Sequence, residues 1–391
     1  MEKVVYAFAG GGGAFPDAAP IEIGGEFYGT TALGGDGGCH AVHGCGVVYE
    51  VSASGQERIV HVFKSGSDGE APNAALLNIN GSLFGTTMYG GGNGCKSAHT
   101  SGCGTVFEVT PSGKELVRYR FSGGNDGALP DSSLTPFKGE LYGEAGAGGT
   151  GNCYLAETSG CGTIFKISPS GRLQTIHTFE GGKEGGTPQG GLVLHDGNFY
   201  GTTSGGGKSC SPYSYGCGTV FKMSPFGSVT ILYAFKGRWK DGATPQGGVV
   251  VVNGALYGTT YVGGKYDCAL SGSGYGCGTV FEVTMSGQEH IVHNFKGIPD
   301  GALPNQLVAG GGNIYGTTEI GGSGGSTCLG PGCGTVFKLT PSGQETILYS
   351  FKSGSDGAGP TSALIENGGT LYGTTGGGGA HNDGTLYSVT P

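Results

Sequence analysis

The sequence predicts an all-β protein, a seven-bladed β-propeller with four antiparallel strands in each blade. Three observations indicate this fold: a motif that recurs seven times, four strand-like segments in each repeat, and complementary segments at the two chain ends. A Tyr-Gly step, Phe-Gly in the second repeat, recurs from Tyr28 to Tyr372, which is 344 residues in six intervals, or about 57 residues per repeat. We expect residues 1–391 to form a single domain.

Two further landmarks keep this period. A proline precedes each Tyr-Gly or Phe-Gly step, and a segment close to "GTVF" follows it. The prolines are Pro20, Pro72, Pro130, Pro188, Pro245, Pro304 and Pro360. The "GTVF" segments begin at Gly46, Gly104, Gly162, Gly218, Gly278, Gly334 and Gly384.

Each repeat contains four predicted strands. The first is the apolar run after the proline, such as 75–79, and a turn of the Asn80-Gly81 type joins it to the second strand, "LYGTT". A long loop rich in Gly and Cys leads to the third strand, "GTVFEVTP", and a Ser-Gly turn such as Ser112-Gly113 leads to the fourth. No apolar period of 3.6 residues is sustained, so we expect no helix.

The chain ends distinguish a closed ring from a solenoid, which is the alternative architecture for such a repeat. The last repeat stops after its third strand, "GTLYSVTP", while the N-terminal segment 3–8, "KVVYAF", resembles a fourth strand. We therefore expect the N-terminal strand to complete the last blade, with 4–8 paired to 385–389. Closure of this kind leaves no exposed sheet edge.

The loop between the second and third strands carries a pair of cysteines in six of the seven repeats. Variable spacing and the lack of a second pair argue against a zinc site, so we expect local disulfides and an oxidising compartment. The pairs are Cys39–Cys45, Cys95–Cys103, Cys153–Cys161, Cys210–Cys217, Cys268–Cys277 and Cys328–Cys333.

Together, "LYGTT", "GCGTVFEVTPSG" and the spaced pattern of Phe, Gly, Asp-Gly, Pro and Leu resemble the GloVer tandem repeats of secreted and surface-anchored bacterial proteins. The resemblance covers essentially the whole chain. It implies export and a repeated β architecture, and it supplies no catalytic residues.

Composition narrows the classes of partner. The chain has 89 glycines among 391 residues, 13% charged residues and a net charge of −9. A sparsely charged acidic chain argues against nucleic-acid binding, and no apolar run is long enough to span a membrane. We expect a secreted or periplasmic monomer from which a signal peptide was removed, with Met1 added for expression.

A carboxylate recurs in the loop that precedes each repeat proline. These carboxylates could bind Ca²⁺ as a ring, or they could shape the turns, and the single carboxylate per loop favours the turn. They are Asp68, Asp126, Glu184, Asp241, Asp300 and Asp356, with Asp17 one residue out of phase in the first repeat.

Four histidines, in contrast, depart from the repeat. His40, His43, His99 and His381 lie in the Cys-loop positions of repeats one, two and seven, which ring closure makes neighbours. Such a cluster could bind Zn²⁺ or Cu²⁺ or serve acid–base chemistry, and the alternative is that these are solvated loop residues. Other histidines, including His61 and His293, lie on fourth strands and are interpreted as structural or surface residues.

Aromatic residues gather in the loops of repeats four and five. Aromatic rings beside polar loops suit stacking on sugars, and the alternative is that they cover the Gly-rich loops. The candidate ligand-binding residues are Tyr213, Tyr215, Arg238, Trp239, Tyr266 and Tyr275.

Two functions remain open from the sequence. The first is a module that binds a glycan or an extracellular protein through the loop-rich face. The second is an extracellular enzyme, a polysaccharide lyase or hydrolase or a metal-dependent enzyme, that uses the histidine cluster. No nucleophile motif or phosphate-binding loop is present, which favours binding.

Overall fold

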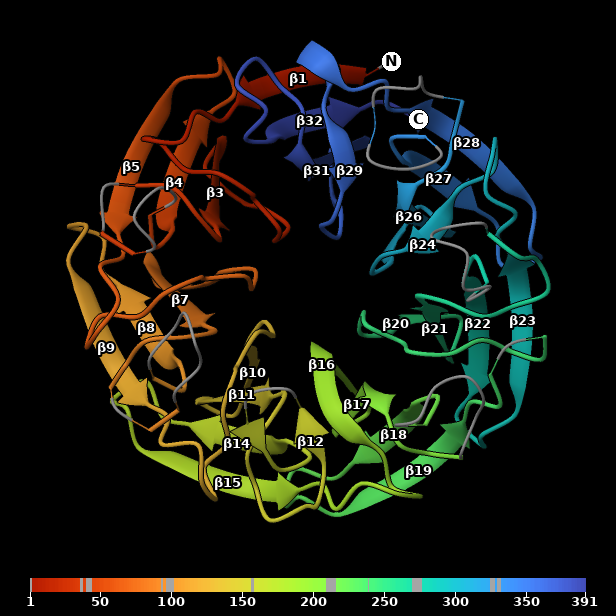
Figure 1. The fold of residues 1–391 in the computed structure, drawn as a ribbon, viewed down its shortest axis with the longest axis horizontal. Coiled ribbons are helices and arrows are strands. Elements are labelled where there is room, and N and C mark those ends of the chain that lie inside the picture. Colours follow the sequence, from red (N-terminus) through yellow and green to blue (C-terminus); the bar gives the residue numbers. More distant parts are fainter. Residues whose placement is uncertain are drawn as a thin grey trace.

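Seven four-stranded antiparallel units surround a central axis and form a seven-bladed propeller (Figure 1). The computed structural model describes residues 2–35, 38–39, 44–92, 94–95, 102–155, 158–208, 216–237, 239–268, 276–323, 328 and 332–391. Within these ranges the helical structure is limited to one short 3-10 turn, η1 (Gly354–Asp356). The predicted fold class is confirmed.

The strands of the first three blades follow the predicted order from the inner to the outer edge. Blade one contains β2 (Ile21–Ile23), β3 (Glu26–Thr31), β4 (Val47–Ser52) and β5 (Glu57–Val62). Blade two contains β6 (Leu77–Ile79), β7 (Ser82–Thr87), β8 (Thr105–Val109) and β9 (Glu115–Arg120). Blade three contains β10 (Thr135–Phe137), β11 (Glu140–Ala145), β14 (Thr163–Ile167) and β15 (Leu173–Thr178), and its Cys loop adds the hairpin β12 (Tyr154–Leu155) and β13 (Thr158–Ser159).

The next three blades keep this order. Blade four contains β16 (Gly186–His195), β17 (Asn198–Gly205), β18 (Thr219–Met223) and β19 (Val229–Ala234). Blade five contains β20 (Val250–Val252), β21 (Ala255–Thr260), β22 (Thr279–Thr284) and β23 (Glu289–Asn294). Blade six contains β24 (Ala302–Pro304), β25 (Val308–Gly310), β26 (Asn313–Ile320), β27 (Thr335–Leu339) and β28 (Glu345–Ser350).

Blade seven joins the two ends of the chain, as predicted. It contains β29 (Ala358–Pro360), β30 (Ile365–Asn367), β31 (Thr370–Gly377) and β32 (Thr385–Val389), and its outer strand is β1 (Glu2–Ala7). The register pairs Glu2 with Val389 and Ala7 with Thr385. Figure 1 shows β1 lying along the outside of β32, next to the C-terminus.

The turns between the first and second strands have the geometry that their sequence predicts. Asn80 and Gly81 both have positive φ angles, 51° and 86°, and so do Asn253 and Gly254, at 50° and 79°. Positive φ at both central residues is typical of type I′ hairpin turns, in which Asn-Gly is favoured.

The core lies between adjacent blades. A phenylalanine at the end of each fourth strand packs edge-on against an aromatic ring of the next blade's third strand, as in Phe63 against Phe107 and Phe295 against Phe337. The same contact closes the ring, where Phe8 packs against Tyr49 with centroids 5.0 Å apart. The second-strand glycine leaves room for this ring, since a Cβ on Gly85 would overlap Phe107.

Five of the six predicted disulfides are present within the described part of the chain. They are Cys39–Cys45, Cys95–Cys103, Cys153–Cys161, Cys268–Cys277 and Cys328–Cys333. Cys217 is also disulfide-bonded, but Cys210 lies outside the described residues, so that pairing stays a prediction.

Candidate functional site

A strained turn lies at the inner end of every loop that connects two blades. The residue before the repeat proline has a φ between 53° and 60° in all seven blades, and in six of them it is not glycine. These residues are Phe15, Ala71, Leu129, Thr187, Thr244, Leu303 and Gly359. Left-handed backbone is rare for branched or bulky residues and persists only where the surroundings impose it.

The preceding blade imposes this conformation. The N–H of Ala71 donates to the carbonyl oxygen of Cys45, and that of Leu303 donates to the carbonyl oxygen of Cys277, each over 3.0 Å. In six blades the acceptor is the second cysteine of the preceding blade's pair. The disulfide loop therefore also holds the turn of the next blade.

The proline of each turn packs on the glycine that begins the preceding blade's "GTVF" segment, which follows the second cysteine in six blades. A Cβ on Gly46 would overlap Pro72, and a Cβ on Gly384 would overlap Pro16. Pro16, rather than Pro20, is therefore the first member of the proline series, and our phase for the first repeat was wrong. Asp17 consequently belongs to the position after the proline, and Gly12 takes the place of the loop carboxylate.

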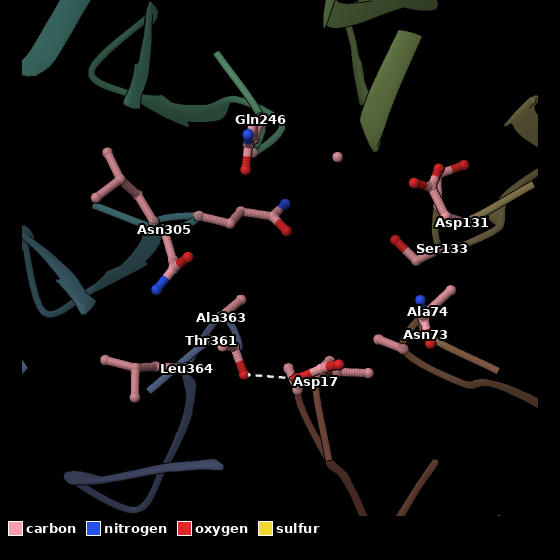
Figure 2. A pocket seen from close by; sticks show the side chains of 18 of the residues that line it. Asp17, Asn73, Ala74, Asp131, Ser133, Gln246, Asn305, Thr361, Ala363 and Leu364 are labelled. Atoms are coloured by element: carbon pink, nitrogen blue, oxygen red, sulfur yellow. Dashed lines mark hydrogen bonds between the residues drawn. The ribbon is translucent and has the colours of Figure 1, made fainter. Parts of the chain in front are cut away.

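In six of the seven blades the strained turn places the residue after the proline on the wall of a central cavity. This residue is polar in all seven blades: Asp17, Asn73, Asp131, Gln189, Gln246, Asn305 and Thr361. All except Gln189 line one cavity of about 350 Å³ at the centre of the ring. In Figure 2, Asp131 and Ser133 lie on one side of this cavity, across from Asn305.

The cavity wall is polar and acidic. Its only ionisable side chains among the described residues are Asp17 and Asp131, and burial raises the pKa of each to about 6. Asp17 accepts a hydrogen bond of 2.9 Å from the Thr361 hydroxyl. The Oδ1 atoms of Asn73 and Asp131 are buried without a hydrogen-bond partner, which is costly unless a ligand or water supplies a donor.

A ring of threonines supports the cavity from the second strands. In six blades this threonine donates to a backbone carbonyl of the next blade's inner segment, as Thr86 does to Ser132 and Thr259 to Asn305. Blade three has Glu144 instead, fully buried, with Oε2 accepting from the N–H of Gly191 over 3.0 Å. Burial raises the pKa of Glu144 to about 8, and the nearby Asp131 carboxylate acts in the same direction.

The loop carboxylates form the turns, as the sequence interpretation favoured. Each accepts a hydrogen bond from a backbone N–H four or five residues earlier, for example Lys64 to Asp68 over 2.8 Å and Lys352 to Asp356 over 2.7 Å. Glu184 does the same in blade four, with the N–H of Glu180. These side chains lie on the connecting loops and not among the residues that line the cavity.

Most of the site residues predicted from the sequence lie outside the described part of the chain. This applies to His40, His43, His99, Tyr213, Tyr215, Arg238 and Tyr275. His381 is exposed, and because the other three histidines lie outside the described residues, the histidine cluster stays a prediction. Trp239 is 57% exposed, and its backbone N–H donates to the carbonyl oxygen of Gly264. Tyr266 lies between Lys265 and Lys296, whose ammonium groups are 5.7 and 5.6 Å from the ring centroid.

Comparison with known families identifies the repeat. The model of the Gloeobacter/Verrucomicrobia repeat matches residues 2–155, 95–270 and 210–391, which together cover nearly the whole chain. The chain belongs to this repeat family. The resemblance to GloVer repeats is confirmed, and no curated protein is significantly similar to this Gloeobacter/Verrucomicrobia repeat protein.

Solved structures share the propeller fold at low sequence identity. A fungal alcohol oxidase of the AA5 family, in complex with copper, is 14% identical with a TM-score of 0.57, over 98% of this chain and 75% of that chain. PorZ of Porphyromonas gingivalis, a surface component of the type-IX secretion system, is 14% identical with a TM-score of 0.51, over 96% and 46%. A gluconolactonase from Xanthomonas campestris is 12% identical with a TM-score of 0.43, over 82% and 86%. These similarities concern the fold alone.

Sequence reasoning overlooked the cavity residues, although a signal was present. A polar residue follows the repeat proline in every copy, but it lies between the proline and the predicted first strand and was assigned no role. With Pro20 taken as the first landmark, Asp17 also fell outside the pattern. Correct phasing of the first repeat would have revealed seven polar positions at one level of the ring.

Proposed function

We propose that the protein binds a carbohydrate, with one sugar unit held in the central cavity. The observation that supports this most strongly is the ring of carboxyl, amide and hydroxyl side chains after the repeat prolines. Carboxylate and amide groups offer the acceptors and donors that sugar hydroxyls require, and a cavity of about 350 Å³ is at the small end of the range of ligand pockets.

The charge of the wall favours a neutral ligand. No Lys, Arg or His is among the described residues that line the cavity, so a phosphate or carboxylate group would meet no counter-charge. The unpartnered Oδ1 atoms of Asn73 and Asp131 are positioned to accept hydrogen bonds from ligand hydroxyls.

A longer glycan would extend toward blades four and five. The loop that carries Trp239 continues directly into Gln246 on the cavity wall, and Tyr266 lies on the neighbouring Cys loop. In this proposal Trp239 stacks on a sugar unit beyond the cavity. Tyr213, Tyr215, Arg238 and Tyr275 belong to the same proposed surface.

The decisive experiment is a screen of neutral oligosaccharides on a glycan array, followed by calorimetry with the best ligand. Asn73→Ala combined with Asp131→Ala should weaken binding at least tenfold, since each removes a hydrogen-bonding group. Asp196→Asn, in an exposed turn, should have no effect. Trp239→Ala should weaken the binding of oligosaccharides and leave the binding of the single sugar unchanged. Unaltered binding by the cavity variant, or the absence of any neutral ligand, would contradict the proposal.

A second candidate is an enzyme that acts on the same class of ligand. Asp131, with its raised pKa, and the buried Glu144 are two interacting carboxyl groups at the one blade that departs from the threonine ring. Such a pair suits acid–base chemistry on a glycosidic substrate. Product formation from labelled oligosaccharides, abolished in Asp131→Asn, would support this candidate over simple binding.

We further propose that the protein acts outside the cytoplasm, as a single-domain monomer. The five observed disulfides support an oxidising compartment. No helix in the described residues has the length and apolar character needed to cross a membrane. Fractionation of the native host, light scattering of the purified protein and a single cooperative unfolding transition would test these three points.

A further inference from the structure

The outer edge of each blade interface brings together side chains from three places. The fourth strand of one blade supplies Tyr or His, and the following loop supplies a carboxylate in six of seven cases. The fourth strand of the next blade begins with Glu in five of seven cases. Histidine, loop carboxylate and glutamate coincide at two interfaces. These are His61, Asp68 and Glu115 between blades one and two, and His293, Asp300 and Glu345 between blades five and six.

The geometry of both clusters suits a metal ion. In each, one ligand atom from every residue lies within 4.8 Å of the other two. The Nε2 of His293 is 3.2 Å from Asp300 Oδ2 and 3.5 Å from Glu345 Oε2. Zinc bonds to nitrogen and oxygen of about 2.0–2.2 Å imply separations of about 3.3 Å between tetrahedral ligands. Small adjustments would bring all three atoms onto one ion.

Unsatisfied atoms point to a missing partner. His61 Nε2, Glu115 Oε1 and Glu345 Oε1 are buried without a hydrogen-bond partner. The three side chains of the second cluster are each 12% exposed, which leaves access for a water molecule as a further ligand. Two carboxyl groups side by side also favour a bound cation.

Two cations lie near the clusters and compete with a metal ion. The positive charge of Arg120 attracts the Glu115 carboxylate, but the Arg120 Nε–H donates its hydrogen bond to the carbonyl oxygen of Ser67. The positive charge of Lys296 likewise attracts the Glu345 carboxylate, but the ammonium group of Lys296 lies over the ring of Tyr266. Neither forms an ion pair with the glutamate among the described contacts, so the carboxylates keep free oxygen atoms.

Other blade interfaces lack either the histidine or the glutamate of these clusters. Where tyrosine replaces histidine, its hydroxyl donates directly to the loop carboxylate, as Tyr119 does to Asp126 over 3.0 Å and Tyr349 to Asp356 over 2.7 Å. His177 lies 3.1 Å from Glu184, but the next blade offers Val229 in place of glutamate. Tyrosine at the histidine position and valine at the glutamate position are therefore compatible with the fold, and both substitutions can serve to test the clusters.

We propose that these two clusters, His61–Asp68–Glu115 and His293–Asp300–Glu345, each bind a divalent transition-metal ion, with Zn²⁺ as the best match. Imidazole with two carboxylates is a donor set suited to Zn²⁺, and ligands from two blades would make each ion a cross-link on the outer edge. These sites are separate from the histidine cluster predicted in the Cys loops.

Calorimetric titration of the chelator-treated, oxidised protein with Zn²⁺ tests the proposal. We expect each single variant, His61→Tyr or His293→Tyr, to lose one equivalent of bound Zn²⁺ and the double variant to lose two. The matched control, His177→Tyr, should bind like the unaltered protein. Zn²⁺ should also raise the melting temperature of the protein, and this shift should shrink in the double variant.

A second pair of variants guards against misfolding. Glu115→Val and Glu345→Val copy the residue found at position 229 and should weaken each site at least tenfold with the histidines in place. Equal Zn²⁺ stoichiometry in the unaltered protein and the double histidine variant would overturn the proposal, with simple His–carboxylate hydrogen bonds as the remaining explanation. An absence of Zn²⁺ binding at about 100 µM metal would overturn it as well.

Discussion

Blade seven and the six other blades bind the strained turn of the next blade through different residues. In six blades the carbonyl oxygen of the second cysteine holds the strained turn of the next blade. Blade seven has no cysteines, and the carbonyl oxygen of Asp383 accepts the equivalent bond from the N–H of Phe15 over 3.0 Å. The Asp383 side chain adds a bond of 2.8 Å from the N–H of Gly10.

This difference shows that the disulfides contribute to the stability of the protein and do not determine the shape of the strained turns. The strained turn at Phe15 forms although blade seven, which holds it, has no disulfide, so a disulfide is not needed to produce the shape of the turn. They instead reduce the conformational entropy of the unfolded chain. Blade seven gains its stability from a strand that only the other end of the chain can supply.

The largest expected effect is the loss of that strand. Deletion of residues 2–7 removes β1 and exposes the edge of β32, and it should lower the free energy of unfolding by at least about 3 kcal/mol. Chemical denaturation measures the loss. Added peptide with the sequence of residues 2–8 should restore part of the stability by strand addition. An unchanged midpoint in the deletion variant would refute the closure.

Removal of one disulfide should cost somewhat less. Cys268→Ser with Cys277→Ser opens a loop of 9 residues in sequence separation, which corresponds to about 2–3 kcal/mol on the chain-entropy model. Thermal unfolding of this variant beside the unaltered protein checks the value. If the turn at Leu303 were shaped by the disulfide itself, the variant would also lose ligand binding in the cavity.

The side chain of Asp383 should contribute about 1 kcal/mol. Asp383→Ala removes the hydrogen bond to Gly10 but keeps the backbone carbonyl that holds Phe15. Denaturant titration should therefore show a small loss of stability with an unchanged slope. Asp196→Asn, which alters an exposed turn carboxylate elsewhere, is the matched control. A loss as large as that of the strand deletion would mean that this bond controls ring closure.

The smallest predicted effect is a pH dependence at the closing strand. Burial and the neighbouring Asp356 raise the pKa of Glu2 to about 7, against the opposing effects of Tyr349 and Lys352. Since the folded state holds this proton more tightly than the unfolded state, stability falls as pH rises from about 4.5 through about 7. Glu2→Gln should flatten this part of the profile, measured as melting temperature against pH. An identical profile in the variant would show that Glu2 does not titrate in this range.

Much of the fold could be predicted from local sequence. The Asn80-Gly81 and Asn253-Gly254 turns and the five described cysteine pairs follow from short patterns whose geometry is nearly independent of context. The pairing of β1 with β32 follows from the complementary strands at the two chain ends. The repeat amplified these signals, because a weak pattern seen seven times becomes a firm one. The phase of the first repeat was the exception: Pro16 lies 12 residues before Tyr28, as Pro72 does before Phe84, whereas Pro20, which we chose, lies only 8 residues before Tyr28.

The polar residue after each repeat proline is visible in the sequence, but tertiary structure decided that these residues line one cavity. Ala71, Thr187 and Leu303 have no intrinsic preference for left-handed backbone, and they adopt it because the preceding blade binds their N–H groups and packs a glycine against the next proline. That turn brings the following polar side chains to the cavity wall. The sequence by itself determined the strands, the disulfides and the closure, which depend on local patterns and complementary ends. The cavity and the two His–Asp–Glu clusters depend on contacts between neighbouring blades, and those contacts exist only once the ring has closed.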